Sequence, residues 1–278
     1  MKTTHVAVDI GMTNIDLVME TGSGLVRRMM LSNQHREAHD QVRQALEAVK
    51  TDLPEGIPVG VTGGRYRTLP DELDGHPLHK VDEMLALGLG GLTLSGLEEA
   101  LVVSAGTGTA MVAARGDDVH HVTGSAVGGG TLLGLSKLIL RTDDPVEINR
   151  LALAGDAAVV DIMLSEAVGG EVGRLPAKAN AVNLGKLDRE NGFTRENLAA
   201  GLVRLVAQVI AVIAINASNA EELGDIVLVG HLMDLESIRN EIALVGDFYK
   251  RSFIIPENPG FGTVIGALAV LRTMDETN

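Results

Sequence analysis

Short apolar runs separated by glycine-containing turns occur in both halves of the chain. In each half, three such runs follow one another with only a few polar residues between them, a pattern typical of antiparallel strands joined by tight turns. The predicted strands cover residues 4–9, 15–20, 25–31 and 57–62 in the first half, and residues 100–104, 110–114, 118–123, 226–230 and 253–256 in the second. Because the same layout occurs twice, we expect two lobes that each begin with a three-strand meander.

Helical periodicity marks the segments between these runs. Val42, Leu46 and Val49 recur at helical spacing in a segment that ends before Pro54. Thr194 precedes the longest helical pattern and can cap its N-terminus through the side-chain hydroxyl. The predicted helices cover residues 34–53, 81–92, 134–140, 146–154, 157–166, 196–223 and 262–274, and residues 177–187 are expected to be irregular.

Composition favours an aliphatic α/β core. Hydrophobic residues make up 45% of the chain and aromatic residues only 2%, so Ala, Val, Ile and Leu must fill the interior, which suits helices packed on sheets. A length of 278 residues allows two lobes. From the repeated layout we place an N-terminal lobe at residues 1–95 and a C-terminal lobe at residues 96–278, each a mixed sheet with flanking helices.

Charge and cysteine content narrow the function classes. The net charge of −14 argues against nucleic acid as a partner, because no run of Lys or Arg could neutralise a phosphate backbone. Without Cys, the chain has no disulfide scaffold, thiolate nucleophile or Cys-ligated metal. The first five residues lead directly into a strand, and the longest apolar run, residues 202–217, contains polar residues and is short for a bilayer. We therefore expect a soluble, cytoplasmic protein with no membrane partner.

Two glycine-rich turns carry the candidate chemistry. Residues 103–109, with the sequence VSAGTGT, alternate Gly and Thr after an apolar strand, so backbone N–H groups and hydroxyls can face an anion. Asp9, Gly11 and Thr13 form a similar turn after the first strand. Each turn alone could be an ordinary hairpin. Their repetition favours two phosphate-binding turns on either side of one nucleotide.

Several segments resemble the type II pantothenate kinases, the fumble-like branch of the fold shared by sugar kinases and actin. The resemblance runs almost end to end and rests on residues 9–11, 62–64, 80–83, 104–109, 123–135, 181–186, 197–203 and 261–267. It implies two ribonuclease H-like lobes around a central nucleotide cleft, and transfer of the γ-phosphoryl group of ATP to the primary hydroxyl of pantothenate in coenzyme A biosynthesis. It also implies a homodimer formed with the help of the helix at residues 196–223.

The resemblance assigns the central chemical roles to two carboxylates. Glu83 lies where the family has its catalytic base, although an acidic residue in a first helical turn can also simply favour the helix dipole. The adjacent Asp82 is the alternative base. Asp9 would hold Mg²⁺, or else would only cap a tight turn.

The remaining site assignments also follow from the resemblance. Two of these assignments have a structural alternative: the glycines at 128–130, assigned to the substrate, could serve close strand–helix packing, and His231, assigned to the adenosine, could belong to a simple strand-to-helix turn. The nucleotide phosphates are assigned to Asp9, Gly11, Thr13, Asn14, Gly106, Thr107, Gly108 and Thr109, the adenosine to Gly230 and His231, and the acceptor substrate to Ser104, His121, Gly128, Gly129, Gly130 and Thr131.

Four positions depart from the family pattern. Met12 replaces a Gly, Asp16 a Lys, His121 an Arg, and His231 the second Gly of the adenosine turn. An imidazole is a poorer, pH-dependent substitute for a guanidinium fork. Two alternatives to a pantothenate kinase therefore stay open: a kinase for another small hydroxy acid or sugar derivative, and a catalytically inactive nucleotide-binding regulator on the same fold.

Overall fold

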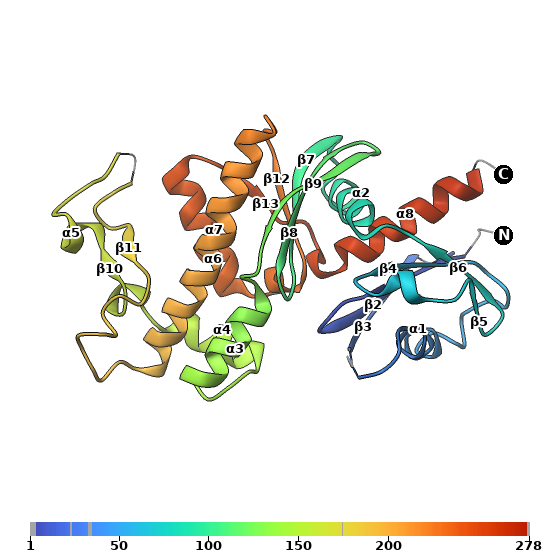
Figure 1. Ribbon diagram of the computed structural model, residues 1–278, viewed down its shortest axis with the longest axis horizontal. Coiled ribbons are helices and arrows are strands. Elements are labelled where there is room, and N and C mark those ends of the chain that lie inside the picture. Colours follow the sequence, from blue (N-terminus) through green and yellow to red (C-terminus); the bar gives the residue numbers. More distant parts are fainter. Residues whose placement is uncertain (1–3, 23, 33–34, 174, 277–278) are drawn as a thin grey trace.

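The computed structural model contains two large mixed β-sheets, with helices between and around them, and a small two-stranded sheet (Figure 1). It describes residues 4–22, 24–32, 35–173 and 175–276. Two predictions fall partly outside the described residues. They concern residues 1–3, which lead into the first predicted strand, and Gln34, the first residue of the predicted helix at residues 34–53.

The N-terminal sheet has six strands in the order β3-β2-β1-β4-β6-β5. Residues of β1 alternate between its two faces: Val6 and Val8 pack with one helix, whereas Ala7 packs with two others. The strands are β1 (His5–Ile10), β2 (Asn14–Thr21), β3 (Gly24–Leu31), β4 (Val59–Gly63), β5 (Glu72–Leu73) and β6 (His76–Lys80), and the helices are α1 (Ala38–Glu47) on the first face and α2 (Glu83–Ser95) and α8 (Gly262–Glu276) on the second.

The C-terminal sheet has five strands in the order β13-β12-β7-β8-β9. Leu101 and Val103 face a large helical layer, and Val102 faces α2 on the opposite side. The strands are β7 (Glu99–Ala105), β8 (Thr109–Arg115), β9 (Asp118–Ser125), β12 (Ile226–Val229) and β13 (Phe253–Ile254), and the helical layer contains α3 (Gly129–Ile139), α4 (Pro145–Ala154), α6 (Arg195–Ala220) and α7 (Glu236–Tyr249). The two predicted meanders, β1–β3 and β7–β9, are both confirmed.

Helices α2 and α8 cross closely between the two sheets (Figure 1). Gly90 of α2 and Gly266 of α8 permit this approach, since a Cβ at Gly90 would overlap the carbonyl oxygen of Gly262, and one at Gly266 would overlap that of Ala86. The C-terminal helix therefore packs on the N-terminal sheet, although the rest of the C-terminal lobe lies beyond α2.

Replacing Gly266 with Ala is expected to destabilise the protein, because the added methyl group must push two helix backbones apart. We expect a loss of about 1–3 kcal/mol in the free energy of unfolding, measured by chemical denaturation. Gly134→Ala in α3 is the matched control: its Cβ would meet nothing within 4 Å, and it should stabilise by about 0.5–1 kcal/mol. Equal effects of the two substitutions would contradict the proposed steric origin.

The predicted helix at residues 157–166 is wrong. That segment contains a short 3₁₀ turn, Ala157–Val159, followed by β10 (Ile162–Met163) and the short helix α5 (Leu164–Ala167), and β10 pairs with β11 (Asn180–Val182) inside the segment predicted to be irregular. Together these elements form an excursion beyond α6 and α7 (Figure 1).

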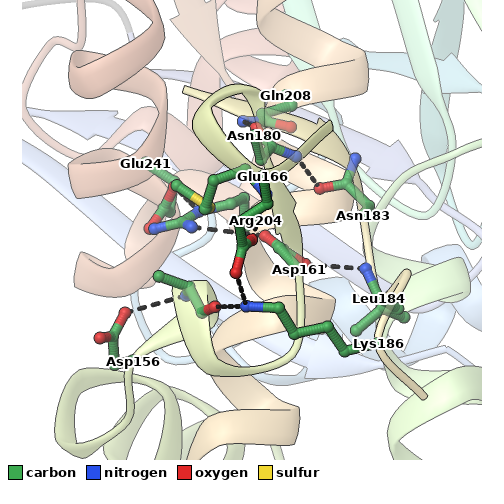
Figure 2. Close-up of polar contacts among 12 residues, drawn as sticks. Asp156, Asp161, Glu166, Asn180, Asn183, Leu184, Lys186, Arg204, Gln208 and Glu241 are labelled. Carbon is green, nitrogen blue, oxygen red and sulfur yellow. Dashed lines mark hydrogen bonds and ion pairs between the residues drawn. The ribbon is translucent and has the colours of Figure 1, made fainter. Parts of the chain in front are cut away.

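A buried carboxylate explains this outcome. Asp161 is fully buried, accepts a hydrogen bond from the Leu184 backbone N–H at 2.7 Å, and lies 3.3 Å from a guanidinium nitrogen of Arg204. Arg204 also pairs with Glu241 of α7 at 2.9 Å (Figure 2). These partners come from three different segments, so a continuous helix could not supply them. The cluster instead fixes the excursion to α6 and α7.

The long helix α6 is a core helix of the C-terminal lobe. Its predicted cap is confirmed, because the Thr194 hydroxyl accepts a hydrogen bond from the Asn197 backbone N–H at 3.2 Å. By length and composition α6 is the one helix in the described ranges that could cross a membrane. On sequence alone the apolar run at residues 202–217 is short for a bilayer, but the helix itself has 26 residues. However, 61% of its most apolar window is buried inside the protein, as expected for a core helix.

Candidate active site

The two predicted phosphate-binding turns lie against each other. The Thr13 and Thr107 hydroxyl oxygens, 94 residues apart in the sequence, are 2.8 Å apart. Thr13 lies in the turn between β1 and β2, and Thr107 in the turn between β7 and β8. Gly11 is required sterically, since a Cβ there would lie 2.7 Å from the Asn14 carbonyl oxygen. The fold thus brings the ends of both meanders to one place.

The glycines at residues 128–130 pack against the second turn and form hydrogen bonds with it. The Gly129 and Gly130 backbone N–H groups donate to the carbonyl oxygens of Gly106 and Thr107, at 2.8 and 2.9 Å. A Cβ at Gly128 would lie 2.7 Å from the Thr107 carbonyl oxygen. Helix α3 begins at Gly129, five residues earlier than predicted. These contacts support the alternative of close strand–helix packing, and the backbone N–H groups of Gly129 and Gly130 are already hydrogen-bonded.

The hydroxyls that flank this turn are also engaged. Thr109 donates to the Val127 carbonyl oxygen at 2.9 Å, and Thr131 donates to the Ala126 carbonyl oxygen at 3.2 Å. Ser104, at the end of β7, pairs in register with Val229 of β12. The Gly108 backbone carbonyl accepts from the Gly106 N–H at 3.0 Å, which closes the turn on itself. The turn is thus rigidly held by its neighbours.

Asp9 ends β1 beside the first turn. No residue within the described ranges donates a hydrogen bond to its carboxylate. Burial raises the pKa of Asp9 to about 8, helped by the negative charges of Asp16 and Glu83 and opposed by His231. Gly63 has a φ of +96°, and a Cβ there would overlap the Asp9 carboxylate, so the glycine makes room for this side chain. Sequence reasoning did not single out Gly63 by itself.

An oxygen donor of this kind suits Mg²⁺. The carboxylate is half-buried and no described residue donates a hydrogen bond to it, so a cation would offset the cost of its ionisation. No cluster of three or more His, Cys, Asp or Glu residues that could hold a metal occurs in the part of the chain that the structure describes. Mg²⁺ is commonly held by one or two carboxylates together with water and phosphate oxygens.

Asp82 is the N-cap of α2. Its carboxylate accepts hydrogen bonds from the backbone N–H groups of Met84 and Leu85 at 3.0 and 3.3 Å. The Tyr66 hydroxyl at 3.1 Å and the Arg67 guanidinium at 3.3 Å donate to its other oxygen. Burial alone would raise the pKa of Asp82, but these hydrogen bonds outweigh it and lower the pKa. A carboxylate held in this way is a poor proton acceptor.

Glu83, the first residue of α2, has the opposite environment. Burial raises its pKa, as does the charge of Asp82, while Arg67 has a smaller lowering effect. Its carboxylate accepts no hydrogen bond from any described residue. The charge of Glu83 also contributes to the raised pKa of Asp9, so the two carboxylates share one electrostatic environment. Of the two neighbouring acids, Glu83 is the one free to take a proton.

His231 connects the two lobes. It follows Gly230, whose φ of +97° and close approach to Ala105 exclude a side chain. Its Nε2 lies 3.0 Å from a carboxylate oxygen of Asp16 on β2, and its Nδ1 lies 2.8 Å from Asp234. Burial alone would lower the pKa of His231, but the hydrogen bonds to Asp16 and Asp234 raise it to about 10.

Two residues that depart from the family pattern lie differently. His121 is exposed on β9, four residues before Ser125, which corresponds to about 13 Å along a strand from the glycine turn. The structure therefore does not bring His121 together with the other predicted site residues. Met12, in the first turn, is 62% exposed.

Comparison with known proteins places this site in a family. A family model described as Fumble matches residues 99–269, more than half of the chain. A type II pantothenate kinase from Staphylococcus epidermidis is 26% identical over 95% of this chain and 98% of its own length, and one from Oceanobacillus iheyensis is 24% identical over 76% and 82%. The chain belongs to the Fumble family, and these relatives of it are type II pantothenate kinases.

Solved structures confirm the predicted two-lobed fold. The activator of the 2-hydroxyisocaproyl-CoA dehydratase from Clostridium difficile, with bound ADPNP, superposes with a TM-score of 0.68. The match covers 99% of this chain and 97% of that one at 17% identity. At this identity the likeness concerns the fold alone.

Proposed function

We propose that this chain transfers the γ-phosphoryl group of ATP to a hydroxyl group of a small molecule, with pantothenate as the first candidate. The observation that carries the proposal is the Glu83 carboxylate, which is partly buried, accepts no hydrogen bond from any described residue and lies in the same electrostatic environment as Asp9. Family membership supplies the substrate class. The activator with bound ADPNP supports a nucleotide on this fold.

Each requirement of phosphoryl transfer has a candidate group. The phosphates would be held by the two glycine turns, with the Thr13 and Thr107 hydroxyls able to donate to them. Asp9 would hold Mg²⁺, which when bound neutralises phosphate charge. Glu83 would orient the acceptor hydroxyl and take its proton as the new bond to phosphorus forms.

Two alternatives have specific support. The position of His121, away from the glycine turns, favours an acceptor other than pantothenate, because the resemblance implies an Arg at this position that can pair with the substrate. The similarity to an activator favours a nucleotide-binding regulator that phosphorylates nothing. Both alternatives keep the nucleotide site and differ in the acceptor.

A panel of acceptors tests the proposal directly. Pantothenate, pantetheine, small hydroxy acids and sugars would each be incubated with Mg-ATP and the protein, and acceptor-dependent ADP release recorded. We expect pantothenate to stimulate release well above the rate of the protein alone. Stimulation by a different acceptor only would replace pantothenate as substrate. ATP binding without stimulation by any acceptor would favour the regulator.

A further inference from the structure

Two of the departures from the family pattern form one ion pair. Asp16 and His231 are 215 residues apart in the sequence, and their side chains lie 3.0 Å apart in space. The side chains are only 8% and 21% exposed.

The Asp16–His231 pair lies next to the strand ends that carry the two glycine turns. Asp16 is the third residue of β2, which starts immediately after the first turn. His231 follows β12, and β12 pairs in parallel with β7, the strand that runs into the second turn. The ion pair therefore joins the two strand ends whose turns touch through Thr13 and Thr107.

The imidazole of His231 has little freedom to move. Asp234 binds its second nitrogen at 2.8 Å, and the ring of Phe261 packs edge-on with 5.7 Å between centroids. A Cβ at Gly260 would overlap the ring, so the Gly260 backbone also packs closely against the imidazole. With a carboxylate at each nitrogen, both nitrogens donate, and the raised pKa of about 10 keeps the ring charged at neutral pH.

We propose that the Asp16–His231 ion pair is a positioning element that fixes the spacing of the two phosphate-binding turns across the lobes. Its effect on catalysis rests on the proposed kinase function. The connection that this ion pair makes between the two lobes, called the tie below, does not depend on that function. Asp16 and His231 are positioning residues here, since they act through the turns. The proposal gives His231 a role other than the adenosine contact that the resemblance implies.

A distance measurement tests the tie without any assay of activity. The chain has no Cys, so Met29→Cys on β3 and Leu138→Cys on α3 give two unique labelling sites, which are 53% and 69% exposed. Spin labels at these sites should give a narrow distance distribution by double electron–electron resonance. His231→Gly should broaden it and shift it to longer distances, and Asp16→Asn, which nearly preserves side-chain shape, should do the same to a smaller extent.

A second histidine pair provides the matched control. His120 on β9 lies 3.1 Å from Glu221 at the end of α6, and both belong to the C-terminal lobe. His120→Gly therefore removes a His–carboxylate pair without touching the connection between lobes, and should leave the distribution unchanged. An unchanged distribution in both His231→Gly and Asp16→Asn would overturn the proposal.

Substitution of Asp16 and His231, singly and together, tests whether the ion pair affects catalysis. Asp16→Lys and His231→Gly should each raise KM for ATP by at least about tenfold, because each breaks a largely buried pair. The double variant loses the same ion pair and should raise KM no further than the worse single variant, with kcat changed less than KM. Additive losses would overturn the positioning role. If the unmodified chain transfers phosphate to no acceptor, the kinase proposal fails, and the distance measurement still decides whether the tie exists.

Discussion

Glu83→Gln is expected to lower the rate of phosphoryl transfer by about 10²–10⁴-fold while nucleotide affinity stays nearly unchanged. The amide has almost the same shape as the carboxylate but cannot accept the proton of the acceptor hydroxyl. Because the phosphate-binding turns are built from other residues, ATP binding should survive. Initial rates of ADP release with the best acceptor, together with calorimetric titration of the nucleotide, measure the two effects separately.

The pH dependence should carry the same signature. A general base works in its deprotonated form, so the rate should rise with pH through the pKa of Glu83. Burial raises that pKa, and the rising limb should therefore lie above the range of an ordinary glutamate. In Glu83→Gln this limb should disappear. A limb that persists in the variant would assign it to another group.

Asp82→Asn is the matched control for this prediction. The substitution removes charge from the cap that binds the N–H groups of Met84 and Leu85, and should cost roughly 1 kcal/mol in the free energy of unfolding. Its rate should fall far less than that of Glu83→Gln. If Asp82→Asn gave the larger loss of rate, the roles of the two acids would be reversed.

Patterns within single segments predicted most of the framework. The short apolar runs of β1 and β2 and the glycines that follow β1 and β7 are local signals, so both meanders were predictable. Helix α7 could also have been found, since Ile238, Ile242 and Val245 recur at helical spacing and are buried. In contrast, β6 has the sequence HPLHK and presents almost no apolar pattern.

Contacts between distant segments explain what the sequence could not predict. The sequence around Asp161 is compatible with a helix. Its contacts with Leu184 and Arg204, which lie far away in the sequence, are visible only in the fold. The partner of Asp16 lies 215 residues away, so the sequence showed a lost cation at that position and could not show that His231 had come to face it. The meeting of the two glycine turns was foreseeable only because the layout occurs twice.

Asp9→Asn is expected to abolish phosphoryl transfer and, without nucleotide, to stabilise the protein. The carboxylate is half-buried and accepts no hydrogen bond from the described residues, so its ionisation opposes folding. Its pKa is about 8 in the folded protein and near 3.8 in the unfolded chain. Between these values the folded state binds the extra proton, and stability must therefore fall as the pH rises from about 4 to about 8.

Asparagine removes this titration while it also removes the charge that Mg²⁺ would need. The free energy of unfolding of Asp9→Asn should exceed that of the original chain by on the order of 1–3 kcal/mol at pH 8.5, with a much smaller difference at pH 4. Mg-ATP should raise the unfolding temperature of the original chain and leave that of the variant nearly unchanged. Denaturation at the two pH values, with and without Mg-ATP, measures both effects. A variant that is less stable at pH 8.5, or that is still stabilised by Mg-ATP, would show that Asp9 has a structural role and does not hold the metal.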